Sequence, residues 1–164
     1  MVGVLGPYFF EDDEGVAITV TSARYVAMLR IFYVPELRHR GIDLSSVWFQ
    51  QDGATAHTTR ASMSVLRGMF PQHVISFGGD VPWPACSPDL SACDYFLWGY
   101  LKSRVSISNT TAEIKQSIRE EKAVISEQMT RRVMENLGVR QKQCLRNGGR
   151  YQSDVLFKIK NGMY

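Results

Sequence analysis

The chain has 164 residues, enough for one domain with a sizeable core. Its hydrophobic content of 45% and aromatic content of 11% exclude a disordered chain. No apolar run reaches the roughly 18–20 residues of a membrane span. The N-terminus lacks the basic region of a secretory signal, and Cys86, Cys93 and Cys144 show no CxxC spacing. We therefore expect an intracellular protein with reduced thiols that is neither secreted nor in a membrane.

The net charge of +3 is unevenly divided along the chain. Residues 1–99 hold 6 Lys/Arg and 10 Asp/Glu, a net charge of −4. Residues 100–164 hold 13 Lys/Arg and 6 Asp/Glu, a net charge of +7. A basic C-terminal part is suited to contact with a polyanion such as nucleic acid. The alternative from charge alone is an ordinary solvated helix surface.

Turn residues and hydrophobic periodicity predict alternating strands and helices in the first half of the chain. We expect Pro35 to disturb the first helix, because proline lacks the N–H of the helical ladder. In order, the expected elements are a hairpin over 2–20, a helix from Thr21 or Ser22 to about Leu37, a strand over 47–51, a helix capped by Thr58 or Thr59 that ends at Phe70, and a strand over 74–77.

The second half is predicted to be mostly helical. A loop rich in Pro and Gly, without regular structure, is expected over 78–93. It should be followed by a helix from Asp94 to about Val105, a helix capped by Thr111, a helix opened by Ser126 that ends at Gly148–Gly149, and a short strand over 155–159. We expect a single domain with an α/β core over about 1–105 and a basic helical part over about 106–164.

Two carboxylates occupy positions from which a fold can gather acids around metal ions. Asp52 ends the apolar run 47–51, and Asp94 stands where the loop gives way to a helix. Taken alone, an Asp at either position is more commonly a turn or cap residue. His57 follows Asp52 by five residues. It either lies near the reacting group or satisfies a local backbone group.

Three phrases give these positions a family context. Phe49–Thr58 (FQQDGATAHT), Ser87–Leu90 (SPDL) and Asp94–Gly99 (DYFLWG) resemble, in this order, the catalytic domain of mariner-like transposases of the DDE/D superfamily. The resemblance covers essentially the whole chain. The 41 residues between Asp52 and Asp94 exceed the commonest family spacing, which indicates a longer-spaced branch. Ser91-Ala92-Cys93 also departs from the Asn and Pro usual before the third acid.

The resemblance implies a ribonuclease-H-like mixed sheet flanked by helices. It also implies DNA cleavage and strand transfer with Mg²⁺ or Mn²⁺, hard ions that prefer oxygen ligands. Asp52 matches the second catalytic acid and Asp94 the third, both as metal ligands, with His57 as an active-site neighbour. The family's first acid lies on a central strand upstream of the hairpin. We therefore expect a fragment that lacks this strand and is inactive alone.

The resemblance further implies a DNA partner, a homodimer and a nuclear or cytoplasmic location. The alternative function is a non-catalytic module, derived from a transposon, that binds nucleic acid or protein. Weak DNA binding without sequence preference is expected from basic residues of the C-terminal third. These are Arg131, Arg132, Arg140, Lys142, Arg146 and Arg150.

Overall fold

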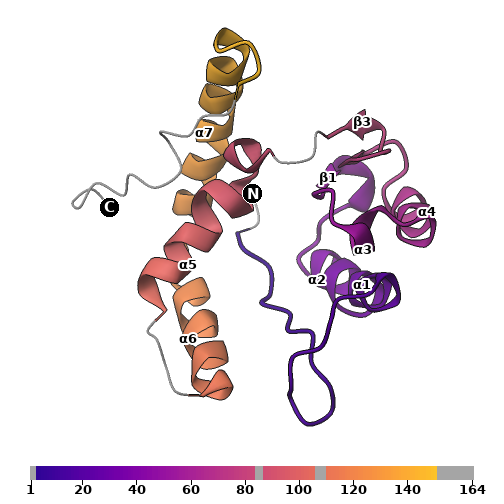
Figure 1. Cartoon of the computed structure of the whole chain (residues 1–164), viewed down its shortest axis with the longest axis vertical. Helices are drawn as coiled ribbons and strands as arrows, with labels where there is room; N and C mark the ends of the chain where they lie inside the picture. The colour runs from indigo at the N-terminus through magenta and orange to yellow at the C-terminus, as the bar shows by residue number, and fades with distance from the viewer. Residues whose placement is uncertain (1–2, 84–86, 106–109, 151–164) are drawn as a thin grey trace. The chain divides into compact units, whose positions relative to one another are not determined.

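The structure is a computed structural model that describes residues 3–83, 87–105 and 110–150 (Figure 1). The chain divides into two compact units. Tyr8–Cys86 form what we call the sheet unit, and Met1–Pro7 with Ser87–Tyr164 form the helical unit. The expected domain boundaries, with a core over about 1–105, remain a prediction. The expected strand over 155–159 lies outside the described residues.

The sheet unit alternates short helices and strands, as the sequence predicts. A π-helical segment, Leu29–Tyr33, joins its first two helices, and a 3₁₀ turn, Leu44–Ser46, precedes the first strand. The helices are α1 (Ser22–Met28), α2 (Val34–His39), α3 (Thr55–Thr58) and α4 (Arg60–Met69), and the strands are β1 (Phe49–Gln50), β2 (Val74–Ser76) and β3 (Val81–Pro82).

The three strands form a parallel sheet in the order β1-β2-β3. Phe49 pairs with Val74, and Ile75 pairs with Val81. The expectation of a loop without regular structure over 78–93 is wrong at β3. β3 can form because the chain makes a tight turn at Gly78 and Gly79. At Gly78 φ is +72°, and a Cβ atom at Gly79 would lie 2.6 Å from the carbonyl oxygen of Val74. Glycine at both positions lets the chain return beside β2.

The expected hairpin over 2–20 forms its turn but no strands among residues 3–20. One antiparallel bridge joins Glu11 to Ala17. The Asp12 carboxylate accepts a hydrogen bond of 2.8 Å from the amide of Val16 and so closes the turn. Two extended arms on their own bury little apolar area, and an isolated two-stranded ribbon is marginally stable. Local turn chemistry was therefore predictable here, whereas strand pairing was not.

The helix predicted over 22–37 is present, with a π-helical segment before Pro35. The amide of Val34 donates to the carbonyl of Leu29, five residues back. A proline ring would clash with the carbonyl four residues before it in a regular α-helix, and the wider turn relieves this contact. The buried side chains follow the altered period: Tyr25, Leu29, Val34 and Leu37 face the core.

The core of the sheet unit lies between α4 and the strands. Leu66, Phe70 and Val74 are fully buried there. The rings of Phe49 and Phe70 stack with their centroids 5.0 Å apart. Thr59 caps α4 by accepting a hydrogen bond of 3.1 Å from the amide of Ser62, and the helix ends before Phe70, as predicted. One face of β1 therefore packs on α4, and α4 is itself held in place by its cap and by its buried side chains.

The described residues of the helical unit form three α-helices. A 3₁₀ turn, Pro88–Leu90, and a π-helical segment, Cys93–Leu97, lead into them. Thr110, one residue earlier than predicted, caps the second, and Ser126 caps the third as predicted. The chain then turns at Gly148 and Gly149, where φ is +65° and +77°. The helices are α5 (Trp98–Arg104), α6 (Thr111–Ala123) and α7 (Glu127–Arg146).

Each helix within the described residues is too short or too polar to cross a bilayer.

Candidate active site

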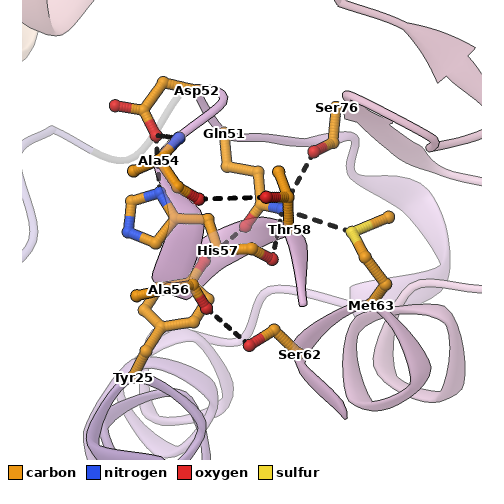
Figure 2. A network of polar contacts seen from close by, with 10 residues as sticks. All are labelled: Tyr25, Gln51, Asp52, Ala54, Ala56, His57, Thr58, Ser62, Met63 and Ser76. Atoms are coloured by element: carbon orange, nitrogen blue, oxygen red, sulfur yellow. Dashed lines mark hydrogen bonds and ion pairs between the residues drawn. The ribbon is translucent and has the colours of Figure 1, made fainter. Parts of the chain in front are cut away.

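Asp52 and His57 meet at the end of β1. Asp52 follows the strand by two residues, and α3 brings His57 back toward it. The Nδ1 atom of His57 lies 2.6 Å from Oδ1 of Asp52, and the Ala54 amide donates to the same oxygen at 3.1 Å (Figure 2). The Asp52 side chain is 67% exposed and that of His57 is 25% exposed. A hydrogen-bonded, solvent-facing carboxylate is therefore held in a defined orientation.

Gln51, the residue before Asp52, is buried beneath this pair. Its Oε1 accepts a hydrogen bond of 2.6 Å from the Tyr25 hydroxyl. Its Nε2 donates to the carbonyl of His57 at 3.1 Å and lies 2.9 Å from Oγ of Ser76. Gln51 therefore links α1, α3 and β2 at one point. Figure 2 shows this amide at the centre of the contacts.

The ring of Tyr25 packs against the imidazole ring of His57. The centroids of the two rings lie 4.3 Å apart, at an interplanar angle of 37°. Burial raises the pKa of Tyr25, and the neighbouring Tyr33 and Asp52 add to the rise. The Tyr25 hydroxyl consequently stays protonated at neutral pH and serves as the donor to Gln51.

Asp94 lies in the first turn of the π-helical segment that leads into α5, in the helical unit. The amides of Asp94 and Tyr95 both donate to the carbonyl of Ser91, each at 3.0 Å. Ala92, and not Asp94, is the capping residue, so the interpretation of Asp94 as a helix cap is not borne out. An acidic side chain in a first helical turn is still stabilised by the positive end of the helix.

Arg140 holds the turn before Asp94 from α7. Its Nη1 donates to the carbonyl of Asp89 at 3.1 Å, and its guanidinium carbon lies 4.3 Å from the centre of the Tyr95 ring. The Tyr95 hydroxyl in turn donates to the carbonyl of Val133 at 2.7 Å. Burial lowers the pKa of Arg140, and Tyr95 and Asp89 oppose the fall. The SPDL turn is thus fixed to the C-terminal helix.

Arg140 corrects the predicted set of DNA-contacting residues. It is only 5% exposed, because it lies on the face of α7 that packs on the turn Pro88–Leu90. The other five basic residues are exposed. Four of them occupy a sector of about 100° around α7, a sector that also contains Glu135. The exposed five are Arg131, Arg132, Lys142, Arg146 and Arg150.

The structure therefore brings together one pair of the predicted site residues, Asp52 with His57. Asp94 belongs to the other unit. Within 3–83, 87–105 and 110–150, no group of three or more His, Cys, Asp or Glu side chains gathers as a metal cluster. The metal-ligand roles of Asp52 and Asp94 remain proposals.

Sequence reasoning missed Gln51 and Arg140 as supports of the two acids. For Gln51 a signal existed. Side chains of a strand alternate between faces, and the apolar Val47 and Phe49 predict that Gln51 shares their inward face. A polar residue at such a position is buried and must find partners. For Arg140 no signal existed, because its partners lie 45 or more residues away in the chain.

Comparisons with known proteins bear on the fold and the class of the chain. No family model and no curated protein matches the chain. Among solved structures, the chain is similar to Mos1 mariner transposase in a paired-end complex with Mn, at a TM-score of 0.70 and 26% identity over 82% of this chain and 38% of that one. It is also similar to the catalytic domain of Mos1 mariner transposase, at a TM-score of 0.63 and 26% identity over 83% of this chain and 66% of that one.

A structure of the Mos1 transposase catalytic domain with raltegravir and Mn gives the same TM-score of 0.63 and covers 67% of that chain. The chain thus spans well under half of the Mos1 chain in the paired-end complex. The fold is that of the ribonuclease-H-like transposase catalytic domains, a mixed α/β architecture. Within this class the chain is similar to the mariner-type transposases, which confirms the resemblance of its sequence motifs.

Proposed function

We propose that this domain derives from an enzyme of metal-dependent DNA cleavage and strand transfer, with Asp52 and Asp94 as ligands of Mg²⁺ or Mn²⁺. The observation that carries the proposal is the likeness to the Mos1 transposase catalytic domain at 26% identity. Structures of that domain were determined with Mn and with Mg.

The donor chemistry of Asp52 fits such an ion. Both hydrogen bonds described for its carboxylate fall on Oδ1, which leaves Oδ2 for a cation. Carboxylate oxygen is the ligand that hard divalent ions prefer. When bound, the ions would activate the attacking oxygen and stabilise the leaving one. The chain's own contribution is to orient the carboxylate through His57 and the amide of Ala54.

Metal binding tests the two ligands directly. Mn²⁺ added to the labelled chain should broaden the NMR signals of residues around Asp52 and around Asp94, because the ion is paramagnetic. Asp52→Asn and Asp94→Asn should each weaken the broadening at their own position. The matched control is Asp13→Asn at an exposed turn, which should change nothing. Unchanged broadening in both site variants would refute the assignment.

The sequence prediction that the chain is inactive alone belongs to the same proposal. Removing one member of a catalytic unit commonly forfeits most of the rate, and this chain matches two of the family's three acids. Incubated with transposon-end DNA and Mn²⁺, the purified chain should leave the DNA intact. Metal-dependent nicking that Asp52→Ala abolishes would contradict the prediction.

A non-catalytic nucleic-acid-binding module is the second candidate function, and the exposed basic residues of α7 favour it. Their sector on the helix surface suits phosphate contacts that need no metal. DNA binding that survives Asp52→Asn and chelation of metal would support this candidate. We also retain the homodimer as a proposal, which sedimentation of the purified chain at several concentrations would test.

A further inference from the structure

Gln51 is a polar residue at a position where the core would otherwise take an apolar side chain. Its side chain is 7% exposed and shares the inward face of the β1 segment with Phe49. Burying an amide costs free energy unless its groups are hydrogen-bonded. A fully bonded polar group in a core, in turn, fixes one arrangement of its neighbours.

The orientation of the Gln51 amide follows from its partners. The carbonyl oxygen of His57 can only accept a hydrogen bond, so the amide nitrogen must face it. The amide oxygen then faces the Tyr25 hydroxyl, 2.6 Å away, which donates to it. The nitrogen also lies 2.9 Å from Oγ of Ser76 and 3.4 Å from Sδ of Met63.

These contacts hold His57 at two places. The amide nitrogen binds its main-chain carbonyl, at 3.1 Å. The amide oxygen holds Tyr25, whose ring lies against the imidazole with centroids 4.3 Å apart. Position and ring plane of His57 are both constrained, and its Nδ1 points at the carboxylate of Asp52, 2.6 Å away. Figure 2 shows the Gln51 amide at the centre of its partners, with the Asp52 carboxylate pointing away from it at the upper left.

We propose that Gln51 is the positioning residue of the Asp52–His57 pair. Through His57 it directs Oδ1 of Asp52 inward and presents the remaining carboxylate oxygen to a divalent cation. The inference rests on the proposed metal-ligand role of Asp52, but its central claim, that Gln51 sets the hydrogen bond between His57 and Asp52, concerns the metal-free chain. The two claims can therefore fail separately.

The test records the proton NMR spectrum of the full chain, with ¹⁵N-labelled histidine and without metal. A short Nδ1–H bond to a carboxylate gives a proton signal far downfield, coupled to the imidazole nitrogen. Gln51→Met should lose this signal for His57, because the substitution removes both the amide oxygen that accepts from Tyr25 and the amide nitrogen that donates to His57. The matched control is Ser76→Ala, which removes a partner of Gln51 on the β2 side and should keep the signal.

A second measurement uses the unmodified chain, so that it does not depend on a variant that folds. The side-chain amide protons of Gln51 should exchange with solvent at least tenfold more slowly than those of the neighbouring Gln50, which is exposed in β1. Equal exchange rates would overturn the proposal, as would a His57 signal that persists in folded Gln51→Met.

Addition of Mn²⁺ then separates this inference from the proposed function. If the His57 signal depends on Gln51 while Mn²⁺ broadens nothing near Asp52, the positioning role stands and the metal-ligand role fails. If Mn²⁺ binds at Asp52 equally well in Gln51→Met, the positioning role has no consequence for the cation and that part of the proposal fails.

Discussion

Arg140 is a cation enclosed by the packing of the helical unit. Its guanidinium group contacts a carbonyl oxygen and the face of an aromatic ring, and both contacts are stronger away from water. The turn before Asp94 therefore depends on a residue of α7, some fifty positions further along the chain.

Replacing Arg140 tests this dependence. Arg140→Met keeps the aliphatic length but loses the hydrogen bond and the cation–π contact, so we expect a loss of roughly 2 kcal/mol or more in the free energy of unfolding. Arg146→Met, at an exposed site of the same helix, should change it by about 0.5 kcal/mol at most. Urea denaturation measures both. Equal effects of the two variants would show that the buried contacts of Arg140 add nothing to the free energy of unfolding.

Because of Tyr25, the stability of the sheet unit should depend on pH in the alkaline range. Because burial raises the pKa of Tyr25 in the folded chain, the folded state binds its proton more tightly than the unfolded state does. The associated stability is complete below the ordinary tyrosine pKa of about 10 and is lost as the pH rises above it.

In Tyr25→Phe, thermal melts between pH 8 and about 11 should therefore show a shallower fall of the melting temperature than the unmodified chain. Tyr8→Phe serves as the control, because Tyr8 is 36% exposed. The same slope in all three proteins would contradict the assignment of the effect to Tyr25.

At the residue scale, the sequence identified residues that stand in recognisable motifs and missed residues whose role depends on how they are buried in the fold. Asp52 and His57 could be named because the family motifs carry them, and their spacing across a short helix allows them to meet, as they do in the structure. Their roles at a metal site remain predictions. Arg140 was placed among the surface cations because charge is visible in a sequence and burial is not. Whether an arginine faces solvent or a tyrosine ring depends on partners that only the folded chain brings near.

At the scale of elements, the turn between β2 and β3 depends on the absence of a side chain at Gly79. A Cβ there would lie 2.6 Å from the carbonyl oxygen of Val74 and 2.9 Å from the amide nitrogen of Ser76. Both contacts are to backbone, which cannot move without shifting β2. β3 consequently exists only while this position stays open.

Gly79→Ala should therefore destabilise the chain by more than about 1 kcal/mol. The matched substitution is Gly68→Ala in α4, where nothing lies within 4 Å of the added atom. It should stabilise by roughly 0.5–1 kcal/mol, because alanine is the better helix former. The midpoints of urea denaturation report both changes, and a neutral Gly79→Ala would show that the turn relaxes freely.

Elements with local signals were the ones that could be predicted. Ser126 before α7 and the glycines after it mark both helix ends, because capping depends on neighbours within a few residues. β3 and the arms of the hairpin were predicted wrongly for the opposite reason. Whether a short extended segment becomes a strand depends on a partner elsewhere in the chain, and the residues themselves allow either outcome.

At the scale of the whole molecule, the basic C-terminal third should dominate any contact with DNA. Lys and Arg side chains that neutralise phosphates release condensed counterions, so binding weakens as salt rises. Each phosphate contact contributes about 0.9 to the slope of the logarithm of the binding constant against the logarithm of the salt concentration.

The double substitution Arg131→Ala and Lys142→Ala should lower the magnitude of that slope by about 2, because we expect one phosphate contact from each residue. Arg30→Ala with Arg38→Ala, two exposed cations of the sheet unit, is the control with the same change in charge. Fluorescence anisotropy with a labelled duplex at several salt concentrations gives the slopes. Equal slopes for the two double variants would place the contact elsewhere.

The wide turn before Pro35 also determines how this chain should be compared with related sequences. A π-helical turn is equivalent to one residue inserted into an α-helix, and one residue rotates the helix surface by about 100°. Tyr25 and Leu29 face the same core as Val34 and Leu37 only because the extra residue lies between the two pairs. An alignment that runs through this helix without a gap would match core positions on one side with surface positions on the other. A relative with a regular α-helix here should be one residue shorter between 29 and 34, and it would have no need of the wider turn.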